Sequence, residues 1–374
     1  MTHLMDARQA GFWLIIALTI SGCENIGTFG GDYRPAASGQ EGFITVVVDS
    51  AQWEQEVGDA LRDSLGKAIM TLPGIEPVFE LVPVQLTSQR ALDRVQERKN
   101  ILMVGAIGDT SSVESRYVNS FLGDSLRQVI LSGDPILVER ANFWRRRQMV
   151  FFLAAATPDE LVTSIAESAD HMLTRFNEVT RQRTHIEMFD IGRQRDLEQI
   201  LMDRHQFAVN GQHDYVIAID TSQFVWLRRT LSDTWRSLFV HYIDNADPSM
   251  LTPEWMLNRR DELTRQYIQG TAGGWVEVDR RRPLEAAEIN FKDRFAIELR
   301  GLWHMVGQEN ERRVLFGMGG PFLTYAFYEE ETRRLYLIDG MVFAPAYPKR
   351  EFLRQLEVIA YTFRTRQEAE RTSA

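Results

Sequence analysis

The stretch LFGMGGPFLTYAFYEEETRRLYLIDGMVFAP, residues 315–345, decides the fold class of the second half of the chain. Apolar residues recur at short intervals after Pro321 and again after Arg333, as they do in largely buried β-strands. With FAIELRGLWHMV (295–306), these segments predict a three-stranded antiparallel meander. We expect a helix from Pro348 to pack against it, because large apolar residues then recur at helical spacing.

The glycine-rich run 317–320 raises the alternative of a phosphate-binding loop. Such a loop needs backbone N–H groups aimed at the anion and a helix N-terminus behind them. Here Pro321 removes one N–H, no Gly-Lys-Ser/Thr follows, and the next residues have a strand pattern. We therefore predict that the glycines form a tight turn leading into a strand.

The first half of the chain alternates short apolar runs with helical patterns. FITVVVD (43–49), NILMVGAI (100–107) and QMVFFLAAA (148–156) are typical of buried strands. A helix is expected over about 113–131. Another begins after Thr157, because Thr, Pro and Glu follow in the order of a capping box, and polar residues interrupt it before a further helix through Leu201.

The fold class predicted from these patterns is α+β, with mixed or antiparallel sheets and packed helices. Residues 42–206 form an N-terminal α/β-like half, and residues 207–374 form a C-terminal α+β half that contains the antiparallel meander. The strand candidates after residue 207 follow one another with short turns, which favours hairpins. We predict two sheet-and-helix halves that meet near residue 207.

Charge argues against a nucleic-acid ligand. The chain of 374 residues has 42 basic and 52 acidic side chains, a formal net charge of −10. Phosphate contacts need a basic surface, and the net field here repels a polyanion, although a local basic patch is compatible with it.

The single cysteine, Cys23, cannot form an internal disulfide or supply a cysteine-based zinc site. It follows FWLIIALTISG, an apolar run too short to span a bilayer but suited to a signal peptide. Ile20-Ser21-Gly22-Cys23 resembles a bacterial lipobox, which implies cleavage after Gly22 and lipidation of Cys23. We predict a lipoprotein signal peptide over residues 1–22 and a flexible tether over 23–41.

No catalytic or metal-binding set stands out. Gly123-Asp124-Ser125-Leu126 has the letters of a hydrolase motif, but the serine sits in a helical pattern and no Asp-x-x-His follows. Ser64-x-x-Lys67 lacks the partner motifs of penicillin-binding enzymes. The histidines show neither His-x-His nor HExxH spacing. We predict no catalytic residue, no metal and no cofactor.

Aromatic and guanidinium side chains gather on the predicted strands of the second half. Strand alternation puts Trp226 and Arg228 on one face and Arg229 on the other. Trp226, Arg228, Arg300 and Trp303 are the candidates for binding an anionic or glycan ligand through stacking and bidentate hydrogen bonds. The alternative is that the arginines only cover a hydrophobic sheet with their aliphatic stems.

Several motifs stand in a family order. FVWLRR, IELRGLW, MGGPF, DGMVFAPAYPKR and RQLE in the second half, with GDALRDSLG and LPGIEPVFEL in the first, resemble an uncharacterised lipoprotein family of Bacteroidota, a domain of unknown function. The resemblance covers nearly the whole mature chain. It implies a lipobox, an envelope location and an α+β body, and it implies no activity.

Two functional hypotheses follow. The first is a non-enzymatic, lipid-anchored cell-envelope protein, periplasm-facing on the inner or outer membrane, that binds a ligand or protein partner. The second is a hydrolase of envelope glycans or esters that uses paired carboxylates, such as Glu298 or Asp339, as acid and base. A structure in which no two carboxylates converge in a cleft would exclude the second.

Overall fold

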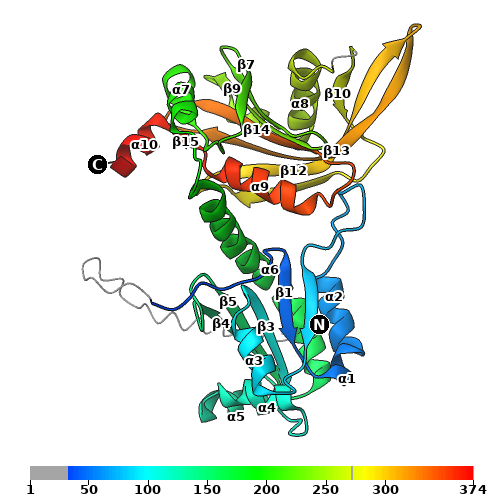
Figure 1. Ribbon diagram of the computed structural model, residues 1–374, viewed down its shortest axis with the longest axis vertical. Coiled ribbons are helices and arrows are strands. Elements are labelled where there is room, and N and C mark those ends of the chain that lie inside the picture. Colours follow the sequence, from blue (N-terminus) through cyan, green and yellow to red (C-terminus); the bar gives the residue numbers. More distant parts are fainter. Residues whose placement is uncertain (1–32, 271–272, 374) are drawn as a thin grey trace, which may run out of the picture. The chain divides into compact units, whose positions relative to one another are not determined.

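The computed structural model describes residues 33–270 and 273–373 (Figure 1). It confirms an α+β fold with one mixed and one antiparallel main sheet. The described chain divides into two compact units. Unit 1 contains residues 33–39, 45–58 and 83–168, and unit 2 contains residues 40–44, 59–82 and 169–373.

This division differs from the predicted meeting of two halves near residue 207. The chain passes into unit 2 for the last time between residues 168 and 169, within a continuous helix. Residues 40–44 and 59–82 also belong to unit 2, although they lie early in the sequence. A boundary inside a regular helix leaves no Gly- or Pro-rich linker by which sequence could reveal it.

The five-stranded sheet of the first half is mixed. Parallel pairs join β1 to β3 and β3 to β5, whereas β4 runs antiparallel to β5. In spatial order its strands are β2 (Glu80–Val84), β1 (Phe43–Val47), β3 (Asn100–Ala106), β5 (Met149–Ala155) and β4 (Ile136–Ala141). The helices of this half before residue 157 are α1 (Ser50–Trp53), α2 (Glu56–Ser64), α3 (Gln89–Gln96), α4 (Val113–Ser120) and α5 (Asp124–Leu131).

Two of the predicted helices have different bounds in the structure. The segment 113–131 is two helices, because the chain leaves the helix at Phe121 and Gly123 caps the next one. The capping box at Thr157 is confirmed: the Glu160 N–H donates to Thr157 Oγ1 at 3.3 Å, and the Thr157 N–H donates to Glu160 Oε2 at 3.3 Å. It starts α6 (Pro158–Phe189), whose interruption before α7 (Arg195–His205) was predicted.

The large sheet of unit 2 is antiparallel throughout. In spatial order its strands are β10 (Trp275–Val278), β12 (Phe295–Glu309), β13 (Arg312–Glu329), β14 (Arg334–Phe343), β9 (Trp235–Asp244), β8 (Phe224–Thr230) and β7 (Val216–Asp220), and β11 (Glu285–Asn290) also pairs with β12. The smaller elements are β6 (Phe207–Ala208) paired with β15 (Arg364–Thr365), a 3-10 helix η1 (Pro248–Met250), and α10 (Arg366–Ser373). The predicted meander is β12, β13 and β14.

Two helices cover opposite faces of this sheet (Figure 1). On the α9 face, Leu356 and Ile359 of α9 (Arg350–Tyr361) share a core with sheet residues such as Tyr325. On the α8 face, Met256 and Leu263 of α8 (Pro253–Tyr267) share a core with Leu299, Trp303 and Phe322. The α9 helix begins where the Glu76 carboxylate accepts hydrogen bonds from the Lys349 and Arg350 N–H groups, at 2.8 and 2.9 Å.

The predicted turn at residues 317–320 is wrong, because these glycines lie inside β13. The strand begins at Arg312, and the register between β12 and β13 shifts opposite the glycines, between His304 and Val306. A Cβ at Gly320 would overlap the Val342 carbonyl, so close backbone packing requires glycine there. Pro321 is tolerated because pairing with β14 starts only at Phe322.

Candidate functional site

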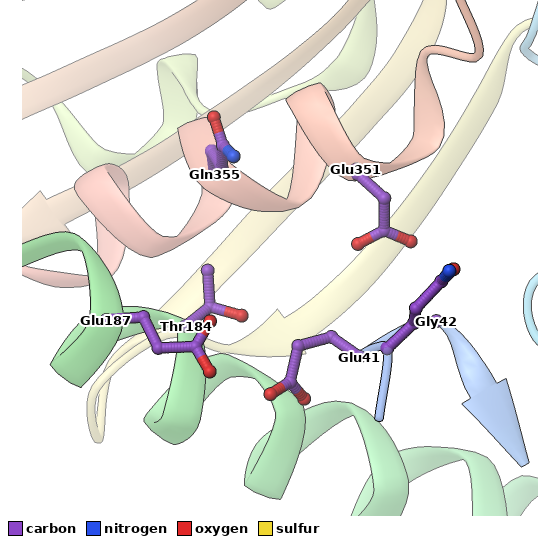
Figure 2. Close-up of a pocket in the computed structure, with 7 residues that line it drawn as sticks. Glu41, Gly42, Thr184, Glu187, Glu351 and Gln355 are labelled. Carbon is purple, nitrogen blue, oxygen red and sulfur yellow. The ribbon is translucent and has the colours of Figure 1, made fainter. Parts of the chain in front are cut away.

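A pocket in unit 2 is bounded by the segment 40–42 and by α6 and α9 (Figure 2). We call it the α6–α9 pocket. Its volume is about 240 Å³. It is lined by Gln40, Glu41, Gly42, Thr184, Glu187, Glu351 and Gln355.

Helical spacing brings the pocket residues onto one wall of each helix. Thr184 and Glu187 are three residues apart on α6, and Glu351 and Gln355 are four apart on α9, so each pair shares a face. Between them, Gly42 has no side chain to fill the space, and a Cβ there would overlap the Glu351 carboxylate. The third wall therefore consists of the Gln40 and Glu41 residues and, at Gly42, of backbone beside the Glu351 carboxylate.

The charges around the pocket are compensated. Glu41 accepts from Arg183 Nε at 2.7 Å, and Arg183 is only 3% exposed. Burial lowers the pKa of Arg183, and the Glu41 charge opposes that shift. Glu351 pairs with Arg350 at 2.8 Å and with Arg354 at 3.1 Å. The pocket thus offers many hydrogen-bond acceptors but no strong net charge from these pairs.

A second polar group lies on the α9 face of the sheet. It consists of Arg181, Glu298, Arg300, Tyr325, Glu357 and Tyr361, and we call it the Glu298–Arg300 cluster. Arg300 binds Glu298 with two hydrogen bonds, of 2.7 and 2.9 Å. It also reaches Glu357 of α9 at 3.3 Å, and Glu357 accepts from Arg181 of α6 at 2.9 Å.

Each ionised group of this cluster is stabilised by its neighbours. Burial opposes ionisation of Glu298, but the Arg300 charge and hydrogen bonds to Glu298 outweigh it and lower its pKa. The pKa of Arg300 lies well above its usual value, because the Glu298 charge outweighs its burial. Burial raises the pKa of Tyr361 to about 12, and the Arg181 guanidinium lies 3.8 Å from its ring centroid. The cluster joins two helices to the sheet and engages Arg300 with two carboxylates through Nε and Nη2.

The structure does not bring the four predicted ligand-binding residues together. Arg300 lies on the α9 face, whereas Trp226 and Trp303 are buried on the α8 face. Trp303 is a core residue whose indole N–H donates to the Val342 carbonyl at 3.2 Å. Arg228 is exposed, with its guanidinium 5.4 Å from the Trp226 ring centroid. A common binding surface of these residues is therefore limited to Trp226 and Arg228.

The two carboxylates of the hydrolase hypothesis lie on opposite faces. Glu298 pairs across the strands with Tyr325, and Asp339 pairs with Thr324, the preceding residue, whose side chain points to the other face. Asp339 is fully buried and accepts from Arg260 of α8 at 2.7 Å. These two groups cannot act together on one substrate bond as acid and base. The hydrolase hypothesis itself stays a prediction, because three other carboxylates, Glu41, Glu187 and Glu351, line one pocket.

Metal-ligand geometry is absent from residues 33–270 and 273–373, where no three His, Cys, Asp or Glu side chains are placed to hold an ion. His205 shows what histidine does instead. Its ring nitrogens lie 2.9 Å from Asp220 and 3.1 Å from the Tyr242 hydroxyl, and it is 2% exposed. This histidine is part of the core.

The pocket was not predicted from the sequence. Its residues come from three distant segments, and no motif joins Glu41 to Glu187 or Glu351. The available signal was weak: polar residues recur at i, i+3 on α6 and at i, i+4 on α9, on the same helices that carry the apolar stripes. Which polar residues of a helix face each other is decided by tertiary packing.

Comparisons with known proteins give no role. Residues 37–189 match the model of DUF8532, and residues 194–362 match that of DUF4837. The chain combines two domains of unknown function. The predicted resemblance to a domain of unknown function is thereby confirmed, and its Bacteroidota and lipoprotein parts stay predictions. No curated protein matches the chain.

Likenesses among solved structures are weak. The Ran-binding protein Mog1p of Saccharomyces cerevisiae is 10% identical over 43% of this chain and 90% of its own, with a TM-score of 0.30. A protein of Bacteroides thetaiotaomicron is 10% identical over 44% of this chain and 46% of its own, with a TM-score of 0.24. Human StAR-related lipid transfer protein 5 is 10% identical over 52% of this chain and 100% of its own, with a TM-score of 0.18. Scores this low carry no argument about function.

The predicted lipidation site, Cys23, and the signal peptide lie outside the described residues. Among the helices that the structure does describe, none has the length and apolar character needed to cross a bilayer.

Proposed function

We propose that the chain is a lipid-anchored cell-envelope protein that binds a small polar ligand in the α6–α9 pocket without transforming it. The observation that carries the proposal is the wall of the pocket. Six of its seven residues have hydrogen-bonding side chains, and their charges are already neutralised in part by Arg183, Arg350 and Arg354.

The chemistry of this wall selects the ligand class. Carboxylate and amide oxygens accept hydrogen bonds, so a matching ligand carries several O–H or N–H donors. At about 240 Å³, the pocket is smaller than the sites of roughly 300–1,000 Å³ that hold drug-sized ligands. A hydroxyl-rich ligand of monosaccharide size meets both conditions. The lipid anchor rests on Cys23 and the apolar run before it.

The binding test compares two glycine variants. In Gly42→Ala the new methyl group displaces the ends of the Glu351 and Arg350 side chains and narrows the pocket. Gly74→Ala is the matched control, because nothing lies within 4 Å of a Cβ at that position in unit 2. The probe is N-acetylglucosamine, followed by saturation-transfer NMR.

We expect a transfer signal from the wild-type chain and from Gly74→Ala, and its loss in Gly42→Ala at unchanged thermal stability. No signal from the wild type, or equal signals from both variants, would refute the pocket as the site. The anchor is tested separately: a Cys23→Ala chain should lose palmitate labelling and leave the membrane fraction, and its retention with label would refute lipidation.

A further inference from the structure

Three segments of unit 1 lie side by side where β3 and β5 begin. They are residues 33–39, 96–99 and 142–148. The Ala37 N–H donates to the Arg146 carbonyl at 2.9 Å, and the Ser38 N–H donates to the Glu97 carbonyl at 2.7 Å. The Gln148 side-chain amide donates to the Arg98 carbonyl at 2.7 Å. The first described residues of the chain are thus fixed to the loop 142–148.

These segments concentrate positive charge. They contain six basic side chains and one acidic side chain, Glu97, in a chain of net charge −10. Glu97 is paired with Arg145 at 3.3 Å. The six basic residues are Arg34, Arg98, Lys99, Arg145, Arg146 and Arg147, of which Arg34, Arg98, Arg146 and Arg147 are exposed. We call this surface the basic patch.

Aromatic side chains accompany the basic patch. Tyr33 is 93% exposed next to Arg34. Phe143 and Trp144 are half-buried, with ring centroids 4.5 Å apart, and Phe121, 40% exposed, lies 5.7 Å from Phe143. The amphipathic rings among them, those of Tyr33 and Trp144, are of the types that favour the boundary between water and lipid, where arginines meet headgroups.

The position of the predicted anchor indicates that the basic patch faces a membrane. Only nine residues separate Cys23 from Tyr33. Even a fully extended chain of that length reaches no more than about 35 Å. Acyl chains on Cys23 would therefore hold residue 33, and the loop 142–148 bonded to the residues after it, close to the bilayer.

We propose that the basic patch docks on a membrane surface of anionic phospholipids and acts as a second membrane signal beside the acyl chains. This inference rests on the proposed lipid anchor for its geometry. Phosphate headgroups complement the arginines. Their attraction acts within about a Debye length, and the short tether keeps the patch within reach of the headgroups and so strengthens a binding that the patch also has alone. The position of the predicted anchor, and not the net charge, favours a membrane over a nucleic acid, the other polyanion.

The test uses the unlipidated chain from Glu24 onward, so that its outcome does not depend on Cys23. Sedimentation with vesicles of phosphatidylcholine alone is compared with vesicles that also contain phosphatidylglycerol. We expect binding to the anionic vesicles only, weakening as salt is added. The variant Arg98→Gln/Arg147→Gln should bind roughly 25-fold more weakly, at about fivefold for each arginine removed.

The matched control is Arg90→Gln/Arg94→Gln, which removes the same charge from two exposed positions on α3 of unit 1 outside the patch. Its affinity for the anionic vesicles should fall less than threefold, and circular dichroism should show that all variants are folded. Equal binding to both vesicle types, or equal losses in both variants, would overturn the proposal. So would tighter binding to a single-stranded oligonucleotide that the patch variant alone abolishes.

Discussion

The two faces of the unit 2 sheet hold their arginines in opposite ways. On the α9 face, Arg300 binds two carboxylates and remains 24% exposed at its side chain. On the α8 face, Arg260 is fully buried, binds only Asp339 through Nε, and stacks 3.9 Å from the Phe322 ring centroid. Its Nη1 and Nη2 atoms, and Asp339 Oδ1, have no hydrogen-bond partner among the residues that the structure describes.

This difference shows what an ion pair contributes in each setting. The Glu298–Arg300 cluster shares each charge among several partners, so losing one partner leaves the others in place. In the described part of the chain, the Asp339 carboxylate has one further hydrogen-bond donor, the Thr324 hydroxyl, at 2.6 Å. Without one member, the other becomes a buried charge with no compensation. The α9 face should therefore tolerate single changes that the α8 face does not.

The largest expected effect is that of Asp339→Ala. It leaves the buried Arg260 guanidinium without its carboxylate and should lower the free energy of unfolding by about 3–5 kcal/mol. Urea unfolding followed by circular dichroism measures it. If Asp339→Ala lost less unfolding free energy than Glu298→Gln, the proposed difference between the two faces would be contradicted.

The double variant Arg260→Met/Asp339→Leu sharpens the same contrast. It removes both charges and fills their space with apolar groups, so the desolvation cost of the pair disappears with the pair. We expect its unfolding free energy to lie within about 1–2 kcal/mol of the wild type or above it. A double variant as unstable as Asp339→Ala would show that packing, rather than charge, sets the cost.

A smaller effect is expected for Glu298→Gln. The amide keeps one acceptor for Arg300, and Glu357 still pairs with that arginine. The loss should be about 1–2 kcal/mol in urea unfolding. The same measurement on Glu357→Gln should give a similar value, and a loss as large as that of Asp339→Ala in either variant would contradict charge sharing.

The smallest expected effect concerns the pH dependence of folding stability. The contributions of Glu298 and Asp339 should change in opposite directions as the pH falls. The pKa of Glu298 is lowered, so its contribution to stability is present above its ordinary value of 4.5 and is lost as the pH falls through the folded-state pKa. Burial raises the pKa of Asp339, so the folded state takes up a proton before the unfolded state does, and stability is gained as the pH falls toward 3.8.

Unfolding free energies across acidic pH check these signs. The advantage of the wild type over Glu298→Gln should shrink on acidification, whereas its advantage over Asp339→Asn should grow. The same sign for both variants would show that the two faces do not differ in their electrostatics.

The sequence predicted the elements better than the site. Strand and helix patterns located β12, β13, β14 and α9, and the capping box located the start of α6, because these signals are local. The strands β10 and β11 were missed, since β11 is short, polar and largely exposed and lacks an alternating pattern. Strand alternation correctly separated Arg229 from Arg228, and Arg229 pairs with Asp214.

The site was hidden for a different reason. The partners of Arg300 are Glu298, two residues away, and Glu357, which belongs to another helix. Sequence shows the abundance of arginines and carboxylates but not which of them meet, so an internally satisfied arginine looks the same as one open to a ligand. The roles predicted for Trp226 and Arg228 stay predictions.

The packing at Gly320 has a consequence for how relatives of this chain are recognised. Because a methyl group at this position meets a backbone carbonyl rather than a flexible side chain, no neighbour can move aside to admit it. A saturation library at residue 320 should then return glycine alone, while Gly74 accepts most replacements. We therefore expect relatives that share this strand packing to keep glycine at the position of Gly320, as a requirement of architecture and not of a reaction.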